Sequence, residues 1–436
     1  MINKNIYEVR RERLMQSLGN GVAILKGAPA QTRTNDTEYP YRQDSDLFYF
    51  TGYAEPGAAC IIDPNNSDQQ FTLFVLPPDP EKEVWTGWRL SFEETMEQYG
   101  ADQTLDIAEF SEYALKAMKS ASKVFTNLNH EKEHQYKMLD QLRQVRGEIQ
   151  RSGGGPESLE SIGSISHEMR LFKDIHEIEL MQKAADISKE AHVKAMQVCV
   201  PGLHEYQLQA VMESHFVFEG GSGPAYTSIV GSGDNATVLH YIKNQDVIKD
   251  GDLILIDAAA EYQMYASDIT RTFPANGKYS DAQKAIYEVV LKAQNAVIEA
   301  AKPGVTFQEL HDLDLKLLVE GMVEIGLLEG SVDEIIETGS YQVYFMHKTG
   351  HWLGLDVHDM GKYMVDNKSR VLEPGMVFTV EPGIYVNSKT SAPEKYRGIG
   401  IRIEDNILIT EKGNRNLTGA VPKEIADIEA IMAQAK

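Results

Sequence analysis

Three histidines, His347, His351 and His358, lie close together in the segment HKTGHWLGLDVHD, in a chain that holds twelve histidines in all. One histidine alone is most often a hydrogen-bonded residue of the core, but three in so short a stretch indicate a metal site or a site of proton transfer. The glycines between them let the backbone approach a ligand closely and argue against a regular helix surface. This segment is therefore the first candidate for chemistry.

Two acidic residues end apolar stretches that are typical of buried strands. KDGDLILID (249–257) runs from a charged turn into an apolar stretch that ends at Asp257, and LEPGMVFTVE (372–381) does the same and ends at Glu381. A buried carboxylate without a partner carries a high desolvation cost, so we expect a cation to meet each of them. For either acid taken alone, a turn that opens to solvent is the alternative, because loops are rich in aspartate.

A second acidic residue follows each of these strands on a returning, β-rich segment. Asp268 lies eleven residues after Asp257, and a turn around residues 261–264 would bring both carboxylates to one end of a β-ladder. Glu404, in GIRIEDNILIT, likewise lies on a strand that returns after the strand ending at Glu381, although the spacing is longer. The distance from the glycine of the charged turn to the first carboxylate is six residues in both halves. The sequence therefore predicts two half-domains of one design that present four acids at their junction.

Together these residues form an oxygen-rich set of metal donors with one imidazole. The candidates are Asp257, Asp268, His351, Glu381 and Glu404. Such a set suits Mn²⁺, Co²⁺, Fe²⁺ or Zn²⁺, and two ions about 3.5–4 Å apart could share bridging acids. A metal pair of this kind activates water and stabilises the oxyanion that forms when a carbonyl is attacked, which is the chemistry of a hydrolase.

Arg402 lies two residues before Glu404 on the returning strand, so the two side chains share one face of that strand. We expect Arg402 to hold a metal ligand or to contact the substrate. The alternative is a plain ion pair on a solvated face, which would contribute little to stability.

The elements that position these residues follow a long helix, which we expect at residues 174–198 from the helical spacing of its apolar residues before Pro201-Gly202. The stretch AMQVCVPGLHEYQLQAVM (195–212) is echoed by AVIEAAKPGVTFQELHDL (296–313), with the two Pro-Gly pairs in register. A helix that stops at Pro-Gly before a second helix is a common pattern, so this echo alone could be a coincidence.

The first part of the chain alternates short apolar, β-rich runs with polar helical stretches, as in GVAILKG (21–27), FTLFVLP (71–77) and KVFTNL (123–128). This alternation predicts an α/β domain. Residues 145–165 are rich in glycine, serine and proline and have no apolar period, so we interpret them as an exposed connection between domains. The length also favours two domains, which we predict at residues 1–172 and 173–436.

The composition excludes several classes of partner. The formal net charge is −23, with 65 acidic against 42 basic residues, so nucleic acid and anionic membranes would be repelled. We find neither the apolar core of a secretory signal in MINKNIYEVRRERLMQ nor an apolar run of about 18 residues that could span a membrane. Cys60 and Cys199 are too few for a disulfide framework. We therefore expect a cytoplasmic protein.

The order Asp, Asp, His, Glu, Glu, with these local strings, resembles the pita-bread metallopeptidases, and within them the Xaa-Pro aminopeptidases (aminopeptidase P). EYPYRQDSDLFYFTGYAEPGA (38–58) is similar to the N-terminal domain of that family. Four further strings resemble the catalytic domain of that family, namely DAAAEYQMYASDITRTFPANGKYS, FMHKTGHWLGLDVHD, LEPGMVFTVEPGIY and YRGIGIRIEDNILIT. The resemblance covers essentially the whole chain. It implies an α/β N-terminal domain followed by a pseudo-symmetric pita-bread catalytic domain.

The resemblance also implies roles for individual residues. The metal ligands would be Asp257, Asp268, His351, Glu381 and Glu404, with Glu381 as the acid/base that handles the proton of the attacking water. The residues that shuttle protons or contact the substrate would be His240, His347, His358 and Arg402. Trp88, in EVWTGWRL, would reach the site of a neighbouring subunit, although Trp85 could take this part. The implied cofactors are two divalent ions, Mn²⁺ first and Co²⁺ or Zn²⁺ as alternatives, and the implied assembly is a homodimer or homotetramer.

The expected function is that of a metal-dependent exopeptidase that releases the N-terminal residue from peptides with proline in the second position, by attack of a metal-bridging hydroxide on the Xaa-Pro carbonyl. Proline has no N–H and a fixed φ, so peptidases that need that N–H fail on this bond. The nearest alternative is a prolidase that is restricted to Xaa-Pro dipeptides. A metal-free relative, either a peptide-binding protein or a creatinase-like enzyme, is the alternative from another class.

Overall fold

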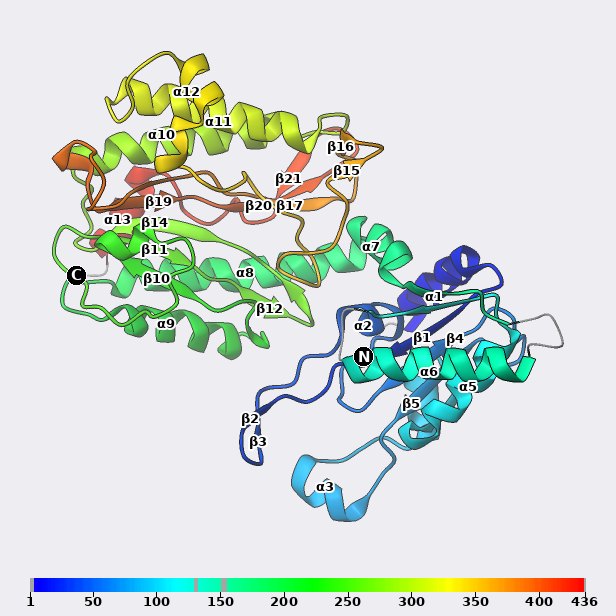
Figure 1. Ribbon diagram of the computed structural model, residues 1–436. Coiled ribbons are helices and arrows are strands. Elements are labelled where there is room, and N and C mark those ends of the chain that lie inside the picture. The colour runs from blue at the N-terminus through cyan, green and yellow to red at the C-terminus, as the bar shows by residue number, and fades with distance from the viewer. Residues whose placement is uncertain (1–3, 129–131, 150–154, 435–436) are drawn as a thin grey trace. The chain divides into compact units, whose positions relative to one another are not determined.

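The computed structural model describes residues 4–128, 132–149 and 155–434 (Figure 1). The chain divides into two compact units, one that ends at Met169 and one that begins at Arg170. Among the described residues, no helix is both long enough and apolar enough to cross a membrane.

The first unit is built on a six-stranded mixed sheet with the strand order β6-β5-β4-β1-β7-β8. Its strands are β1 (Val22–Lys26), β4 (Ala59–Ile62), β5 (Phe71–Val75), β6 (Gln103–Asp106), β7 (Lys123–Thr126) and β8 (Ser158–Ser161), and a separate hairpin consists of β2 (Thr32–Thr34) and β3 (Thr37–Glu38). The helices are α1 (Lys4–Leu18), α2 (Ser45–Thr51), α3 (Pro80–Thr86), α4 (Phe92–Tyr99), α5 (Phe110–Ser120) and α6 (Lys132–Ile149). Strand residues such as Val22 and Phe74 pack with Met118 of α5 and Val145 of α6 in one core, so the predicted α/β architecture is confirmed.

The predicted connection at residues 145–165 is wrong where the structure describes it. Helix α6 continues to Ile149, residues 150–154 lie outside the described part, and β8 then pairs in parallel with β7 as an edge strand of the sheet. The helix α7 (Gly163–Leu171) follows. The side chains of β8 are half-buried, and only Leu159 among them is apolar. An edge strand of this kind is held by backbone hydrogen bonds, which leave no apolar period in the sequence.

The second unit repeats a pair of helices. Helix α8 (Ile175–Val198) begins after Asp174, whose carboxylate accepts from the N–H of Glu177, and this confirms the predicted helix at 174–198. It is followed by α9 (Glu205–Phe218), and the second pair consists of α10 (Asp281–Ala300) and α11 (Phe307–Glu324). The Pro-Gly turns have the same conformation, with φ of 97° at Gly202 and 92° at Gly304. The echo between 195–212 and 296–313 is therefore a structural repeat.

The strands of the second unit repeat as well. One antiparallel sheet consists of β10 (Ile229–Ser232), β11 (Leu253–Asp257) and β14 (Thr270–Pro274), and the other of β17 (Val377–Val380), β20 (Asp405–Ile409) and β21 (Asn414–Asn416). Both outgoing strands, β11 and β17, follow a glycine in the left-handed region, with φ of 87° at Gly251 and 93° at Gly375. The predicted pair of half-domains is confirmed.

Smaller elements complete this unit. They are β9 (Gly223–Pro224), β12 (Ala260–Tyr262), β13 (Tyr265–Ala266), the hairpin of β15 (Met364–Val365) and β16 (Lys368–Ser369), the pair β18 (Gly383–Val386) and β19 (Ile399–Arg402), and the helices α12 (Val332–Thr338) and α13 (Ile425–Gln434). In Figure 1, α10 and α11 lie on one side of the strands and α8 and α9 on the other. Ile254 and Phe273 of the first sheet pack in one core with Ala191 of α8 and Ile286 of α10. The helices thus support the strands whose ends carry the candidate ligands.

Candidate metal centre

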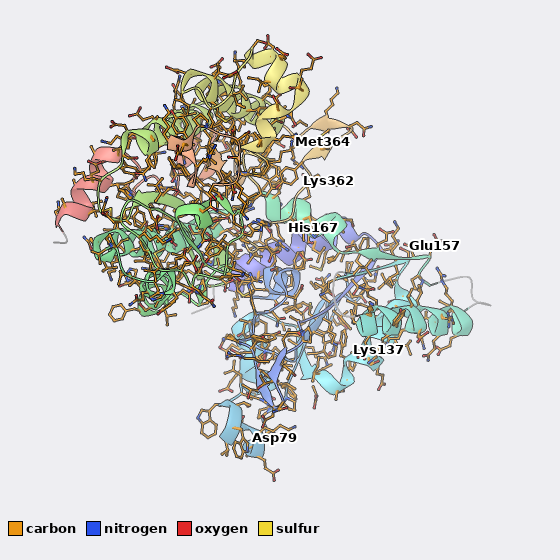
Figure 2. The ribbon with its side chains drawn as sticks, turned by 60° about the vertical axis from the view of Figure 1, so that its left-hand side comes forward. Asp79, Lys137, Glu157, His167, Lys362 and Met364 are labelled. Carbon is orange, nitrogen blue, oxygen red and sulfur yellow. The ribbon has the colours of Figure 1, made fainter. Side chains whose placement is uncertain are left out.

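A cavity of about 790 Å³ in the second unit collects nearly all of the predicted site residues. Those that line it are Asp257, Asp268, His351, Glu381, Glu404, His240, His347, His358 and Arg402. Met364 lines it too, and Figure 2 shows this residue with Lys362 at the edge of the unit. Residues that are up to 164 positions apart in the chain, from His240 to Glu404, therefore meet at one place.

Each half-domain offers one carboxylate at the end of its outgoing strand and one just before its returning strand. Asp257 is the last residue of β11 and pairs with Thr270, while Asp268 lies just before β14. Glu381 directly follows β17, and Glu404 directly precedes β20. The turn between the first two acids lies at residues 263–264, within the predicted range. The repeat thus brings four acids to the junction of the two halves.

His351 is placed beside Glu381 by a short backbone ladder. The N–H of Thr379 donates to the carbonyl of His351 (2.9 Å), and the N–H of Glu381 donates to the carbonyl of Thr349 (2.8 Å). Between these bonds, a Cβ atom on Gly350 would lie 1.8 Å from the carbonyl oxygen of Thr379, so only glycine fits. As a result His351 Nε2 lies 3.5 Å from Glu381 Oε1.

Three of the candidate ligands form a compact group of metal donors. One donor atom from each of Asp268, His351 and Glu404 lies within 4.8 Å of the other two. His351 Nδ1 lies 3.0 Å from the carbonyl of Trp352, and donation there leaves Nε2, which faces the carboxylates, as the nitrogen that could bind a metal. His351 Nε2 is 3.3 Å from Asp268 Oδ2. This is the arrangement that an imidazole ligand needs.

The acids of this group repel one another in a buried place. Burial raises the pKa of Asp268, raises that of Glu381 to about 7, and raises that of Glu404 well above its usual range, with neighbouring carboxylates adding to the effect. Burial opposes the charged form of His351, but its contacts with Asp268 and Glu381 raise the pKa to about 9. A multivalent cation would relieve this repulsion, so the donor set fits a divalent metal.

Arg402 connects the two half-domains. Its guanidinium donates to Asp257 Oδ2 (2.6 Å), Thr270 Oγ1 (3.1 Å) and the hydroxyl of Tyr385 (3.1 Å). Arg402 is only 3% exposed, so the alternative of an ion pair on a solvated face is wrong. A guanidinium with three partners fixes the orientation of Asp257.

The remaining histidines surround the acids. His347 Nε2 lies 2.8 Å from the hydroxyl of Tyr385, and burial together with the charge of Arg402 lowers the pKa of this histidine to about 4. The rings of His358 and His351 meet edge to face at 4.3 Å, and burial lowers the pKa of His358. His240 is exposed at the wall of the cavity. At neutral pH His347 is therefore an uncharged hydrogen-bonding group.

Two tyrosines that the sequence did not indicate also belong to the site. Tyr226 donates to Asp257 Oδ1 (2.7 Å), and Tyr385 links Arg402 with His347. Tyr226 lies in a loop and Tyr385 in an apolar strand, and neither has a spacing that distinguishes it from the other tyrosines of the chain. Only the tertiary contacts reveal them.

Trp88 is not among the residues that line the cavity. It lies in the first unit, just after α3, and is 93% exposed, while Trp85 is 86% exposed. Two exposed indole rings so close together are typical of a surface that contacts another molecule. The role of Trp88 at the site of a neighbouring subunit stays a prediction.

Comparison with known proteins identifies related chains over the full length. Residues 179–411 match the model of metallopeptidase family M24, and residues 7–125 match the aminopeptidase P N-terminal domain. The Xaa-Pro aminopeptidase of Escherichia coli (strain K12) is 41% identical over 440 residues, which cover 100% of this chain and 99% of the relative. The Xaa-Pro aminopeptidase of Haemophilus influenzae is 43% identical over 430 residues, which cover 98% and 97%.

Solved structures agree with these relatives. Aminopeptidase PepP of Pseudomonas aeruginosa superposes with a TM-score of 0.97 at 44% identity and covers 100% of this chain and 99% of its own. Escherichia coli aminopeptidase P in complex with substrate superposes with a TM-score of 0.95 at 40% identity and covers 100% and 99%. The predicted fold, an α/β N-terminal domain followed by a pita-bread catalytic domain, is thereby confirmed.

Proposed function

This chain belongs to metallopeptidase family M24, and from that premise we propose that the cavity of its second unit is the catalytic site. The chain acts as a metal-dependent aminopeptidase that releases the N-terminal residue from peptides with proline in the second position. Its full-length similarity to Xaa-Pro aminopeptidases favours this function over the prolidase alternative. The observation that carries the assignment of the site is the convergence of all five candidate ligands in one cavity.

The family and the donor group at Asp268, His351 and Glu404 indicate a divalent metal. We propose two ions, held by these three residues together with Asp257 and Glu381. The set is rich in oxygen, which favours Mn²⁺, and Co²⁺ or Zn²⁺ are the alternatives. The solved structures include a zinc-substituted Escherichia coli aminopeptidase P in complex with product. When bound, the ions supply Lewis acidity, which activates water and stabilises negative charge on the substrate carbonyl.

Glu381 is our proposed acid/base. Its carboxylate lies in the cavity beside His351 and accepts a hydrogen bond from Thr379 Oγ1 (3.2 Å). A carboxylate in this place can take a proton from the attacking water and deliver it to the leaving proline nitrogen. Arg402 keeps Asp257 in place during these transfers.

The proposed substrate contacts come from the wall of the cavity. His240, His347 and His358 offer imidazole groups that shuttle protons and bind the substrate carbonyl, and Arg402 supports them through Tyr385. Apolar side chains, among them Leu239 and Val357, offer surface to a ring that has no N–H to satisfy. The acids attract the free α-amine of a peptide, which favours cleavage at the N-terminus.

Removal of metal tests this assignment. The protein is treated with a chelator, dialysed, and assayed on an Xaa-Pro-Yaa tripeptide before and after re-addition of Mn²⁺, Co²⁺ or Zn²⁺. We expect activity to be lost without metal and to return with stoichiometric metal, Mn²⁺ giving the highest turnover. Full activity in a metal-free preparation, verified by elemental analysis, would exclude the proposed chemistry.

We propose further that residues 173–436 form the catalytic domain and residues 1–172 the N-terminal domain. Cys60 and Cys199 are buried free thiols, which suits the reducing cytoplasm that we propose as the compartment. The exposed Trp88 supports a homodimer or homotetramer in which it reaches the cavity of a neighbouring subunit. Light scattering of the native protein and of Trp88→Ala tests the assembly: we expect an oligomer for both, with a raised KM for the variant.

A further inference from the structure

Behind the ligand segment, three buried polar side chains form a chain of hydrogen bonds. Asp314 and His311 lie one turn apart on α11 and both contact Thr349. The hydroxyl of Thr349 donates to Asp314 Oδ2 (2.6 Å), and since a hydroxyl has one proton, its oxygen accepts from His311 Nδ1 (2.8 Å). All three residues are buried, and His311 also lines the cavity.

Thr349 connects this chain to the proposed metal ligands. It lies two residues before His351, and its carbonyl accepts the hydrogen bond from the N–H of Glu381. Gly350, between Thr349 and His351, is packed against the backbone of Thr379 so closely that no side chain fits. The ligand segment is therefore held on one side by β17 and on the other by the side chain of Thr349.

Asp314 is a costly residue for its position. It is 0% exposed, and its Oδ1 atom has no hydrogen-bond partner among the residues that the structure describes. Burial raises the pKa of this carboxyl to about 7. An apolar residue of similar size would normally stabilise such a place better than a carboxylate does. A cost of this kind indicates a contribution other than stability.

We propose that Asp314, acting through Thr349, is a positioning residue for the metal centre. The bond from Thr349 to Asp314 fixes the side chain of Thr349, which fixes its carbonyl and so the backbone of Glu381 and the approach of His351. This inference rests on the proposed function, because it takes Glu381 and His351 as ligands. Loss of the Thr349 hydroxyl or of Asp314 loosens the two ligands without removing either.

Calorimetric titration of Mn²⁺ into the metal-free, full-length protein tests the proposal. Thr349→Val keeps the shape of the side chain and removes the hydroxyl, and we expect it to bind Mn²⁺ about 10- to 100-fold more weakly. Thr349→Ser keeps the hydroxyl, so we expect it to bind Mn²⁺ within about 3-fold of the wild type. Each tenfold change in affinity corresponds to about 1.4 kcal/mol. Equal affinity in Thr349→Val and the wild type would overturn the proposal.

Two further variants separate positioning from folding. Asp314→Val replaces the buried carboxyl with an apolar group of similar size, so we expect an unchanged or higher melting temperature together with weaker Mn²⁺ binding. A melting temperature and an affinity that fall together would overturn the proposal. Thr51→Val is the matched control, since Thr51 is a buried threonine of α2 whose hydroxyl donates to the carbonyl of Leu47 (2.8 Å). Weakened Mn²⁺ binding in this control, equal to that of Thr349→Val, would also overturn it.

The same titration distinguishes this inference from the function on which it rests. If the wild type takes up no Mn²⁺, Co²⁺ or Zn²⁺ and shows no activity with them, the proposed function fails. If the wild type binds metal and turns over Xaa-Pro-Yaa, while Asp314→Val matches it in both, only the positioning role fails.

Discussion

At the scale of single residues, the position of Arg402 on its strand was predictable from the sequence, but its partner in the other half-domain was not. Its spacing from Glu404 predicts that the two side chains share one face of a strand, and its burial excludes a surface ion pair. Tyr385, 17 positions away, lies on the paired strand β18, but Asp257, 145 positions away, meets Arg402 only because two half-domains face each other. No local pattern encodes such a contact, because it depends on how the halves pack.

Arg402→Lys tests the role of this guanidinium. A lysine keeps the positive charge but cannot donate to Asp257, Thr270 and Tyr385 at once. We expect kcat/KM for an Xaa-Pro-Yaa peptide to fall about 10- to 100-fold, which corresponds to the loss of one or two charge-assisted bonds. Arg397→Lys, at an exposed arginine just before β19, is the control and should keep wild-type kinetics. Wild-type kinetics in Arg402→Lys would contradict the role.

His192 of α8 makes stability depend on pH. It is fully buried, its Nε2 lies 3.0 Å from the carbonyl of Ala258, and burial, aided by the charge of Arg271, lowers its pKa from 6.5 to about 3. Below pH 6.5, His192 is therefore protonated in the unfolded chain but stays neutral in the folded chain. The free energy of unfolding falls as the pH falls from 6.5 towards 3. At pH 5 the loss amounts to about 2 kcal/mol.

His192→Gln isolates this contribution, because glutamine keeps a donor for Ala258 and does not titrate. The measurement is the free energy of unfolding in urea at pH 8 and at pH 5. We expect the drop between the two values to be about 2 kcal/mol smaller in the variant than in the wild type. An equal drop in both proteins would mean that other groups cause the pH dependence.

At the scale of elements, the strands that carry the acids were predictable and the segment that carries His351 was not. The first group has apolar stretches, a glycine at a fixed distance and a repeat, and these patterns follow from burial and from turn geometry. Residues 349–353 run beside β17, to which a few backbone hydrogen bonds join them, without forming a regular strand. So short and irregular a pairing leaves no apolar period in the sequence, and only the histidines and glycines indicated that the segment matters.

Gly350→Ala tests the backbone ladder between this segment and β17. The new methyl group would meet the carbonyl oxygen of Thr379, which is backbone and cannot move aside cheaply. We expect the variant to lose divalent-metal binding and at least about 10-fold in kcat, as measured by titration and by kinetics. Gly147→Ala in α6 is the control, since a Cβ there meets no atom within 4 Å. Metal binding retained by Gly350→Ala would refute the close packing.

At the scale of the whole molecule, the pseudo-symmetry of the second unit explains why four acids meet. Each half contributes one carboxylate at the end of an outgoing strand and one before a returning strand. His351 has no counterpart in the first half, and Asp257 is instead held by Arg402 and Tyr226. We therefore expect the two metal positions to differ in ligation and in affinity.

The division of the chain into two domains was only partly predictable from the sequence. The polar stretch at 145–165 has the composition of a connection, yet its described flanks belong to helix α6 and to the edge strand β8. The composition of a short, half-buried edge strand resembles that of a loop, so composition alone does not separate the two. The family resemblance, which rests on long strings, carried the identification of the substrate class further than spacing alone.

We propose that the second unit hydrolyses the Xaa-Pro bond at the N-terminus of peptides longer than two residues. The most direct test measures kcat/KM of the Mn²⁺-loaded protein for three substrates that share one N-terminal residue: Xaa-Pro-Yaa, Xaa-Pro and Xaa-Ala-Yaa. We predict rapid release of Xaa from Xaa-Pro-Yaa and negligible cleavage of Xaa-Ala-Yaa. Activity confined to the dipeptide Xaa-Pro, or equal activity on the alanine peptide, would contradict the account.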